Sequence, residues 1–248
     1  MTERDIAESA KEIRAQAPGI GAYKMFVILK DVYPDRMVGR DKFYRVMHEY
    51  GLMLKPERKR HTTNSNHNYR KYKNLVKGFK PTGMNQLWVA DITYIDTDEG
   101  VLYLHLLTDA YTHEIIGWTL SDSLMAENTV NSLKEGIEHV GRYGLERLIH
   151  HSDRGSQYCC NAYIATLNSI NATISMTEDY SPTDNAIAER VNGIIKQEWL
   201  YRMRRPKDMA EATKVLTGII RFYNNVRPHM NNKDMLPPTK YKERLTAA

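Results

Sequence analysis

The sequence has three carboxylates in settings where an acidic side chain could do chemistry. Asp91 lies in a segment rich in apolar and aromatic residues, which predicts a strand, and a carboxylate is costly to bury there without a cation or hydrogen bonds. Asp153 follows a second apolar run, just before Gly155, where a turn can leave its side chain exposed. Glu189 lies beside a stripe of apolar residues at helical spacing, with 35 residues between it and Asp153.

Three acidic groups brought together repel one another, and a hard divalent cation relieves that repulsion. Mg²⁺ takes few protein carboxylates and leaves its other positions to water and to phosphate oxygens. Two such ions can activate an attacking oxygen and stabilise the leaving one in phosphoryl transfer. The remaining acidic residues are interpreted as caps or surface charges. Among them Asp109 also follows an apolar run, and we expect it to lie in a turn or cap.

The segments around these carboxylates predict a mixed sheet with helices packed on it, an α/β fold. Three strands in a meander are followed by alternating helices and strands, then by the Glu189 helix and a last amphipathic helix. Strands are expected at 87–95, 101–109, 114–120, 145–150 and 173–176. Helices are expected at 126–140, 156–167 and 209–226.

The first 50 residues predict short helices over 2–16, 21–32 and 40–50. The last two, joined by a turn, suggest a helix-turn-helix unit. A helical hairpin that only packs or dimerises remains the alternative. If the unit docks on DNA, the exposed candidates on its second helix are Arg40, Lys42, Arg45 and His48.

The most basic stretch runs from Lys55 to Lys80 and is polar. We interpret it as a linker that orders on nucleic acid, where Lys and Arg displace counterions from phosphates. His61 and His67 do not predict zinc, because no cysteine pair follows at finger spacing. The candidate DNA contacts in this stretch include Lys59, Arg60, Arg70, Lys71 and Lys73.

At this point the sequence resembles the acidic-triad (DDE) transposases and retroviral-type integrases. It most resembles the OrfB protein of bacterial insertion sequences. The shared features are the residues around each carboxylate, their order, the 35-residue gap and a basic residue seven positions after Glu189. The matching motifs are Trp88 to Thr93, His151 to Tyr158, Asp184 to Glu189, Lys196, and Phe222 to His229.

The resemblance implies an RNase H-like catalytic core that cleaves DNA strands and transfers them, with Asp91, Asp153 and Glu189 binding Mg²⁺ or Mn²⁺ in a two-ion site. Arg190 and Lys196, on the Glu189 helix, are expected to contact phosphates. The implied partners are double-stranded DNA at the element ends and the target, an OrfA-type protein or fusion, and further copies of the chain. A metal nuclease of the same fold and a non-catalytic DNA-binding relic are the alternatives.

Composition sets the remaining expectations. The 248 residues carry a formal charge of +5, a modest basic excess that favours polyanions. The adjacent pair Cys159 and Cys160 is not expected to form a bridge, which fits a reducing compartment, and no membrane span or signal peptide is apparent. We therefore expect a cytoplasmic protein, associated with the nucleoid when bound to DNA. The expected parts are a helical module (1–54), a basic linker (55–83), the catalytic core (84–205) and a C-terminal helix with a proline-punctuated tail (206–248).

Overall fold

A computed structural model describes residues 1–54, 70–141, 144–178 and 185–247. The chain forms two compact units, each assembled from separate stretches of sequence. Unit 1 contains Met1–His61, Ile194–Arg204 and Thr217–Ala248, and unit 2 contains Thr62–Gly193 and Arg205–Leu216. Lys59 and Arg60 lie outside the described residues. Among the helices that the structure describes, none has the length and apolar character needed to cross a membrane.

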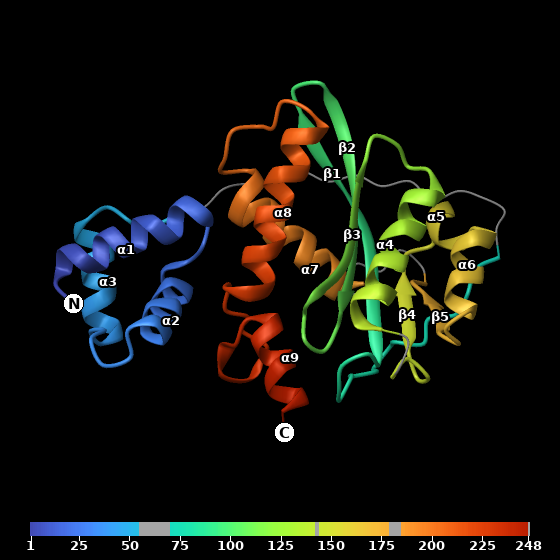
Figure 1. Cartoon of the computed structure of the whole chain (residues 1–248), viewed down its shortest axis with the longest axis horizontal. Coiled ribbons are helices and arrows are strands. Elements are labelled where there is room, and N and C mark those ends of the chain that lie inside the picture. The colour runs from blue at the N-terminus through green and yellow to red at the C-terminus, as the bar shows by residue number, and fades with distance from the viewer. Residues whose placement is uncertain (55–69, 142–143, 179–184, 248) are drawn as a thin grey trace. The chain divides into compact units, whose positions relative to one another are not determined.

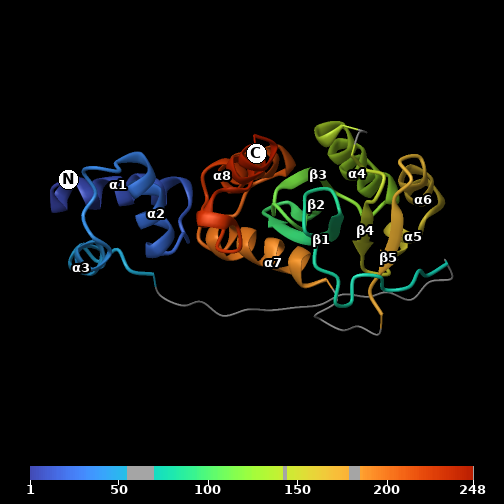
Figure 2. The same ribbon diagram turned by 90° about the horizontal axis from the view of Figure 1, so that it is seen from below.

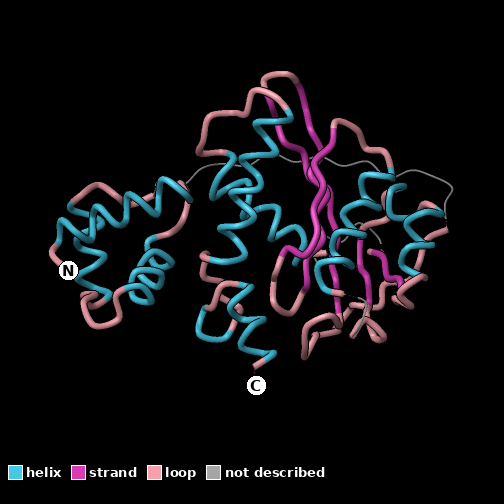
Figure 3. Tube along the Cα trace, viewed as in Figure 1, coloured by secondary structure: helices cyan, strands magenta, loops and turns pink. Residues whose placement is uncertain are grey.

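Unit 2 is built on a five-stranded mixed sheet with the order β3-β2-β1-β4-β5 (Figure 1). β1 (Leu87–Thr97), β2 (Gly100–Asp109) and β3 (Ile115–Ser121) form an antiparallel meander. β4 (Ile149–Ser152) pairs in parallel with β1, and β5 (Thr173–Met176) pairs in parallel with β4. The tube in Figure 3 shows the strands and the helices around them. This arrangement confirms the predicted α/β class with a mixed sheet.

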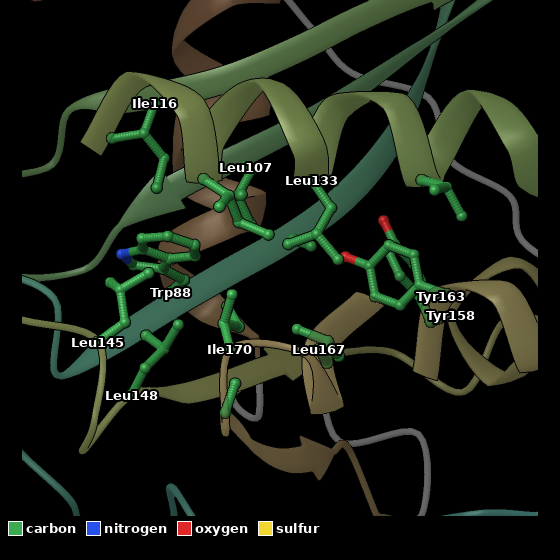
Figure 4. Packing of buried hydrophobic residues seen from close by; sticks show 14 of the residues in the cluster. Trp88, Leu107, Ile116, Leu133, Leu145, Leu148, Tyr158, Tyr163, Leu167 and Ile170 are labelled. Atoms are coloured by element: carbon green, nitrogen blue, oxygen red, sulfur yellow. The ribbon is translucent and has the colours of Figure 1, made fainter. Parts of the chain in front are cut away.

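Alternation along β1 separates two apolar layers, because successive side chains of a strand point to opposite faces. Trp88 and Ala90 belong to the larger layer, which α4 (Ala126–Val140) and two shorter helices complete (Figure 4). Leu87 and Val89 belong to the smaller layer, which includes residues of α7 (Ala186–Ile195). Figure 2 shows α4 and the start of α7 on opposite sides of the sheet. Asp91 is two residues beyond Val89 and therefore shares the α7 face.

The predicted helix over 156–167 is interrupted. α5 (Ser156–Cys159) and α6 (Asn161–Asn168) are separate helices, because Cys160 adopts extended backbone angles (φ −68°, ψ 151°). Its thiol then accepts a hydrogen bond from the amide of Tyr163 and caps α6. The strand expected at 145–150 is also shifted, since β4 begins only at Ile149. Leu145 and Leu148 are instead buried in the loop before it.

The N-terminal residues of unit 1 form α1 (Glu3–Gln16), α2 (Ala22–Val32) and α3 (Arg40–Glu49). α1 starts at a capping box formed by Thr2 and Asp5, in which each side chain accepts from the other residue's amide. Gly51 follows α3 with φ +66°, a left-handed conformation that glycine adopts without strain, and so ends the helix. The predicted inward residues of α3 are all buried: Phe43, Val46 and Met47.

The other stretches of unit 1 come from the end of the Glu189 helix and from the C-terminus. α7 continues directly into a π-helical turn, η1 (Lys196–Leu200), where Trp199 is buried and donates its indole N–H to the Gln16 carbonyl at 2.8 Å. The expected last helix is α8 (Met209–Asn225). The proline-punctuated tail adds a 3₁₀ turn, η2 (Lys233–Met235), and a further helix, α9 (Pro238–Thr246). Proline suits the start of α9 because the first helical residue needs no N–H partner.

Candidate active site

The parallel pairing of β1 with β4 brings the first two carboxylates together. Val89 is in register with His151, so the same register continued by two residues places Asp91 beside Asp153. Neighbouring strands lie about 4.8 Å apart, which puts the two side chains within reach of one small ligand. Ile149 packs in the smaller apolar layer, so Asp153, four residues later, lies on the same α7 face as Asp91.

The Asp91 carboxylate is held by two donors. The Asn192 side chain donates to Oδ2 at 2.7 Å, and the Ile92 amide donates to Oδ1 at 2.9 Å. Burial, and after it the charges of the neighbouring Asp153 and Glu189 carboxylates, nevertheless raises the pKa of Asp91 to about 7 against the effect of those two hydrogen bonds. The Asp91 carboxyl group therefore keeps its proton up to near neutral pH in the absence of a cation.

α7 supplies the third carboxylate on the face that contacts β1. Asn185, Glu189 and Asn192 are spaced by four and three residues and so share one side of the helix. The Asn185 side chain donates to the Ala90 carbonyl at 3.0 Å, next to Asp91 on the strand. Two asparagines thus fix the helix to β1 on either side of Glu189, whose own side chain is exposed. Sequence reasoning missed both asparagines, although their spacing from Glu189 was a visible signal.

Asp153 lies in the turn that the sequence predicts. Its Oδ1 accepts the Gly155 amide at 2.9 Å, and α5 begins one residue later. The Asp153 side chain is half-buried. Its charge adds to the effect of burial in raising the pKa of both Asp91 and Tyr158. For Tyr158 burial is the larger cause.

Asp109 differs from these residues in the way that the sequence suggested. Its carboxylate accepts from the backbone amides of Asn85, Tyr111 and Thr112 and from the Thr112 hydroxyl, at distances of 2.7 to 3.1 Å. The side chain is 2% exposed and stabilises the turn between β2 and β3. With its oxygens used by the protein itself, Asp109 is a structural residue.

Within the described ranges, no group of three or more His, Cys, Asp and Glu residues lies close enough together to hold a metal ion. Asp91, Asp153 and Glu189 share one face without forming a closed ligand shell, and the charges of Asp153 and Glu189 add to the effect of burial on the pKa of Asp91. Glu189 is exposed, so its side chain has room to turn toward the two aspartates.

The residues expected to contact DNA lie in several places. On α3 the basic side chains pair with acidic neighbours: Arg45 lies 3.1 Å from Glu3 and 3.7 Å from Glu49, and Arg40 lies 3.0 Å from Asp41. Lys42 is 4.0 Å from Glu3. Arg190 is exposed next to Glu189 on α7, and Lys196 is the first residue of η1. Arg70, Lys71 and Lys73 are exposed in the segment before β1.

Comparison with known proteins assigns the family. Two models of the integrase core domain match the chain, over residues 81–182 and 171–237. The chain is 38% identical over 211 residues to the uncharacterized 31 kDa protein of insertion element IS600 from Shigella sonnei, covering 84% of this chain and 76% of that protein. It is 30% identical over 253 residues to the transposase of insertion sequence element IS904 from Lactococcus lactis, covering 98% and 96%. The chain belongs to the insertion-sequence transposases.

Solved structures agree with this assignment at the level of the fold. The integrase catalytic core domain of HTLV-2 superposes with a TM-score of 0.51 at 15% identity, covering 65% of this chain and 99% of that domain. A chain of the simian T-cell lymphotropic virus intasome gives the same TM-score and identity, covering 89% of the transposase and 70% of that chain. The predicted RNase H-like integrase core is therefore confirmed. As an insertion-sequence transposase with this core, the protein is a polynucleotidyl transferase of DNA transposition.

Proposed function

We propose that Asp91, Asp153 and Glu189 are the catalytic triad of this transposase, and that they bind the divalent cations on which strand cleavage and strand transfer depend. The observation that supports this most directly is the register of β1 and β4. It aligns the two aspartates on the face to which α7 brings Glu189. Three acidic residues, from β1, from the turn after β4 and from α7, thus share one face of the sheet.

The donor set suits a hard cation. Carboxylate oxygens are the protein ligands that Mg²⁺ and Mn²⁺ prefer, and the raised pKa of Asp91 reflects burial first and then the like charges of Asp153 and Glu189. Asp91, Asp153 and Glu189 would together hold the two ions. When bound, such ions activate the attacking oxygen and stabilise the leaving oxygen of an in-line phosphoryl transfer.

The protein's own residues then have separate tasks. Asn192 orients the Asp91 carboxylate, and Asn185 holds the start of α7 against β1. Arg190, exposed one residue after Glu189, is placed to contact a phosphate of the bound strand. Asp91 must lose its proton to act as a ligand, so cation binding and proton release are coupled near neutral pH.

The substrates belong to the same proposal. Double-stranded DNA would supply the element ends and the target, the first reaction being hydrolysis and the second an attack by the freed 3′-hydroxyl. Joining two ends calls for at least two copies of the chain, and an OrfA-type protein or fusion would supply end recognition. We assign recognition of the element ends in part to the N-terminal helices over 1–54. In this division of the chain, 55–83 is a basic connection, 84–205 is the catalytic core and 206–248 is its C-terminal extension.

A metal nuclease of the same fold would cut DNA without joining it. Pre-cleaved element ends offered with a target plasmid separate the two activities, because a transposase joins them and a nuclease does not. Family membership favours the transposase.

The triad is tested by the thermal stability of the purified protein during titration with Mn²⁺ or Mg²⁺. A ligand that binds the folded state raises its apparent stability by RT ln(1 + [L]/Kd), about 2.7 kcal/mol at 100 Kd. We expect this rise in the wild type and its loss in Asp153→Asn. The matched control is Asp96→Asn, which removes the same charge from an exposed position on β1 and should keep the rise. An equal response in the wild type and Asp153→Asn would make Asp153 a structural residue.

A further inference from the structure

Residues 70–79, here called the edge segment, lie against the last strand of the sheet. They form neither a helix nor a strand, and they precede β1 in the sequence. Three hydrogen bonds join them to β5 and the residues after it: from Leu75 N to Ser175 Oγ (2.9 Å), from Asn74 N to Glu178 Oε1 (3.0 Å) and from Met176 N to the Lys73 carbonyl (3.3 Å). The described part of the predicted linker is thus docked on the catalytic core.

Side chains of the edge segment alternate between the protein and solvent. Tyr72 packs on the larger apolar layer and Val76 on the smaller one, so the segment crosses the open edge of the sheet from one face to the other. The intervening Lys71, Lys73 and Lys77 are all exposed. Docking of the apolar residues therefore fixes the direction in which the lysines point.

These lysines differ from the basic residues of α3, which pair with acidic neighbours. Lys71, Lys73 and Lys77 make no ion pair with any residue in the described part of the chain. A row of lysines that form no ion pair with the described residues is suited to a polyanion, because their ammonium groups remain available to phosphates.

The row also reaches the end of the sheet that carries Asp153. Burial, and after it the charge of Asp153, raises the pKa of the Cys159 thiol to about 11, while the positive charges of Lys71 and Arg154 oppose this rise. Lys71 and Asp153 therefore both lie within electrostatic range of the same thiol. Cys159 Sγ in turn lies 3.6 Å from Met176 Sδ. Met176 is the residue whose amide binds the edge segment.

We propose that the edge segment is a phosphate-binding strap that holds the backbone of one DNA strand beside the carboxylates, with Lys71 and Lys73 as its main contacts. The strap would act on any sequence, since it offers only point charges and no group that reads a base. The inference rests on the proposed function for its substrate, DNA, but not on the identity of the catalytic residues.

The test measures DNA binding by the full chain in the absence of divalent metal. The probe is a fluorescein-labelled duplex of arbitrary sequence, followed by anisotropy over a range of NaCl concentrations. Lys71→Gln/Lys73→Gln is compared with the control Lys134→Gln/Lys214→Gln, which removes the same charge from exposed positions on α4 and α8. Circular dichroism checks that both double variants are folded.

We expect the slope of log K against log salt to become shallower by about 1.8 in the strap variant, since each phosphate contact on duplex DNA contributes roughly 0.9. Affinity should fall about tenfold near ~0.1 M salt. The control should stay close to the wild type. Equal losses in both pairs would mean that only net charge matters, and an unchanged slope in the strap variant would mean that DNA passes elsewhere. Either result overturns the strap.

Failure of the triad would appear in a different measurement. DNA binding in the absence of metal needs no chemistry. The binding comparison is therefore the same whether or not Asp153→Asn still cleaves DNA. A strap variant that binds normally would reject this inference while leaving the catalytic proposal intact.

Discussion

Replacing Asp91 by asparagine should stabilise the metal-free protein at alkaline pH. The pKa of Asp91 is raised from 3.8 to about 7, so between these pH values the folded protein holds a proton that the unfolded chain has lost. Stability therefore falls as pH rises through this window, and above about pH 7 the full penalty applies. At about 1.4 kcal/mol per pH unit, the penalty is about 4 kcal/mol.

The asparagine amide in Asp91→Asn avoids most of this penalty. The introduced asparagine would have no charge to desolvate and no repulsion from Asp153, but its NH₂ cannot accept one of the two hydrogen bonds that Asn192 and Ile92 donate now. Losing one such bond costs about 1 to 1.5 kcal/mol. We expect Asp91→Asn to be more stable than the wild type by about 2 to 3 kcal/mol at about pH 8 and slightly less stable at about pH 4.

Urea unfolding in EDTA, followed by tryptophan fluorescence, measures the difference at both pH values, with the buried Trp88 reporting on the larger apolar layer. Asp96→Asn, exposed on the same strand, should show little change at either pH. A difference that does not vary with pH, or a less stable Asp91→Asn at about pH 8, would refute the raised pKa. Saturating Mg²⁺ should remove the advantage, because the cation stabilises only the wild type.

Two further predictions concern packing outside the site. Glu198 is half-buried and binds two cations: Arg227 through both carboxylate oxygens at 2.8 Å, and Lys24 at 2.6 Å. Burial favours a higher pKa for Glu198, but the two cations outweigh it and hold the pKa below the usual range. Glu198→Gln should therefore be less stable than the wild type by about 3 kcal/mol at neutral pH, and urea unfolding should show this deficit disappearing as pH falls through the depressed pKa, where the wild-type carboxylate is protonated too. Gly117→Ala should destabilise the protein by roughly 1 to 3 kcal/mol, because a Cβ there would collide with the Ser132 carbonyl of α4. Circular dichroism should show this as a lower melting temperature. The same change at Gly218, which has open space around it, should not lower the melting temperature.

The amphipathic patterns were sufficient to predict most of the elements. α1, α2, α3, α4 and α8 lie within a residue or two of the expected ranges, because each has apolar residues at helical spacing and clear end signals. The errors arose where local propensity did not decide. An apolar run predicts a continuous helix over 156–167, whereas extended angles at Cys160 split it, and Leu145 and Leu148 are buried without belonging to a strand.

The sequence by itself determined the types of the three carboxylates, their order and their elements, and family resemblance attached a chemistry to them. Only the tertiary structure decided that they converge, because the β1–β4 register and the position of α7 depend on contacts between residues that lie far apart in the chain. Only the tertiary structure likewise showed that Asn192 donates a hydrogen bond to Asp91, which lies 101 positions earlier in the chain. It also showed where the lysines at 70–79 lie, which composition alone assigned to a linker. A basic stretch becomes a fixed row of charges only when its alternate side chains find a sheet edge to pack on, and no local pattern records where that edge will be.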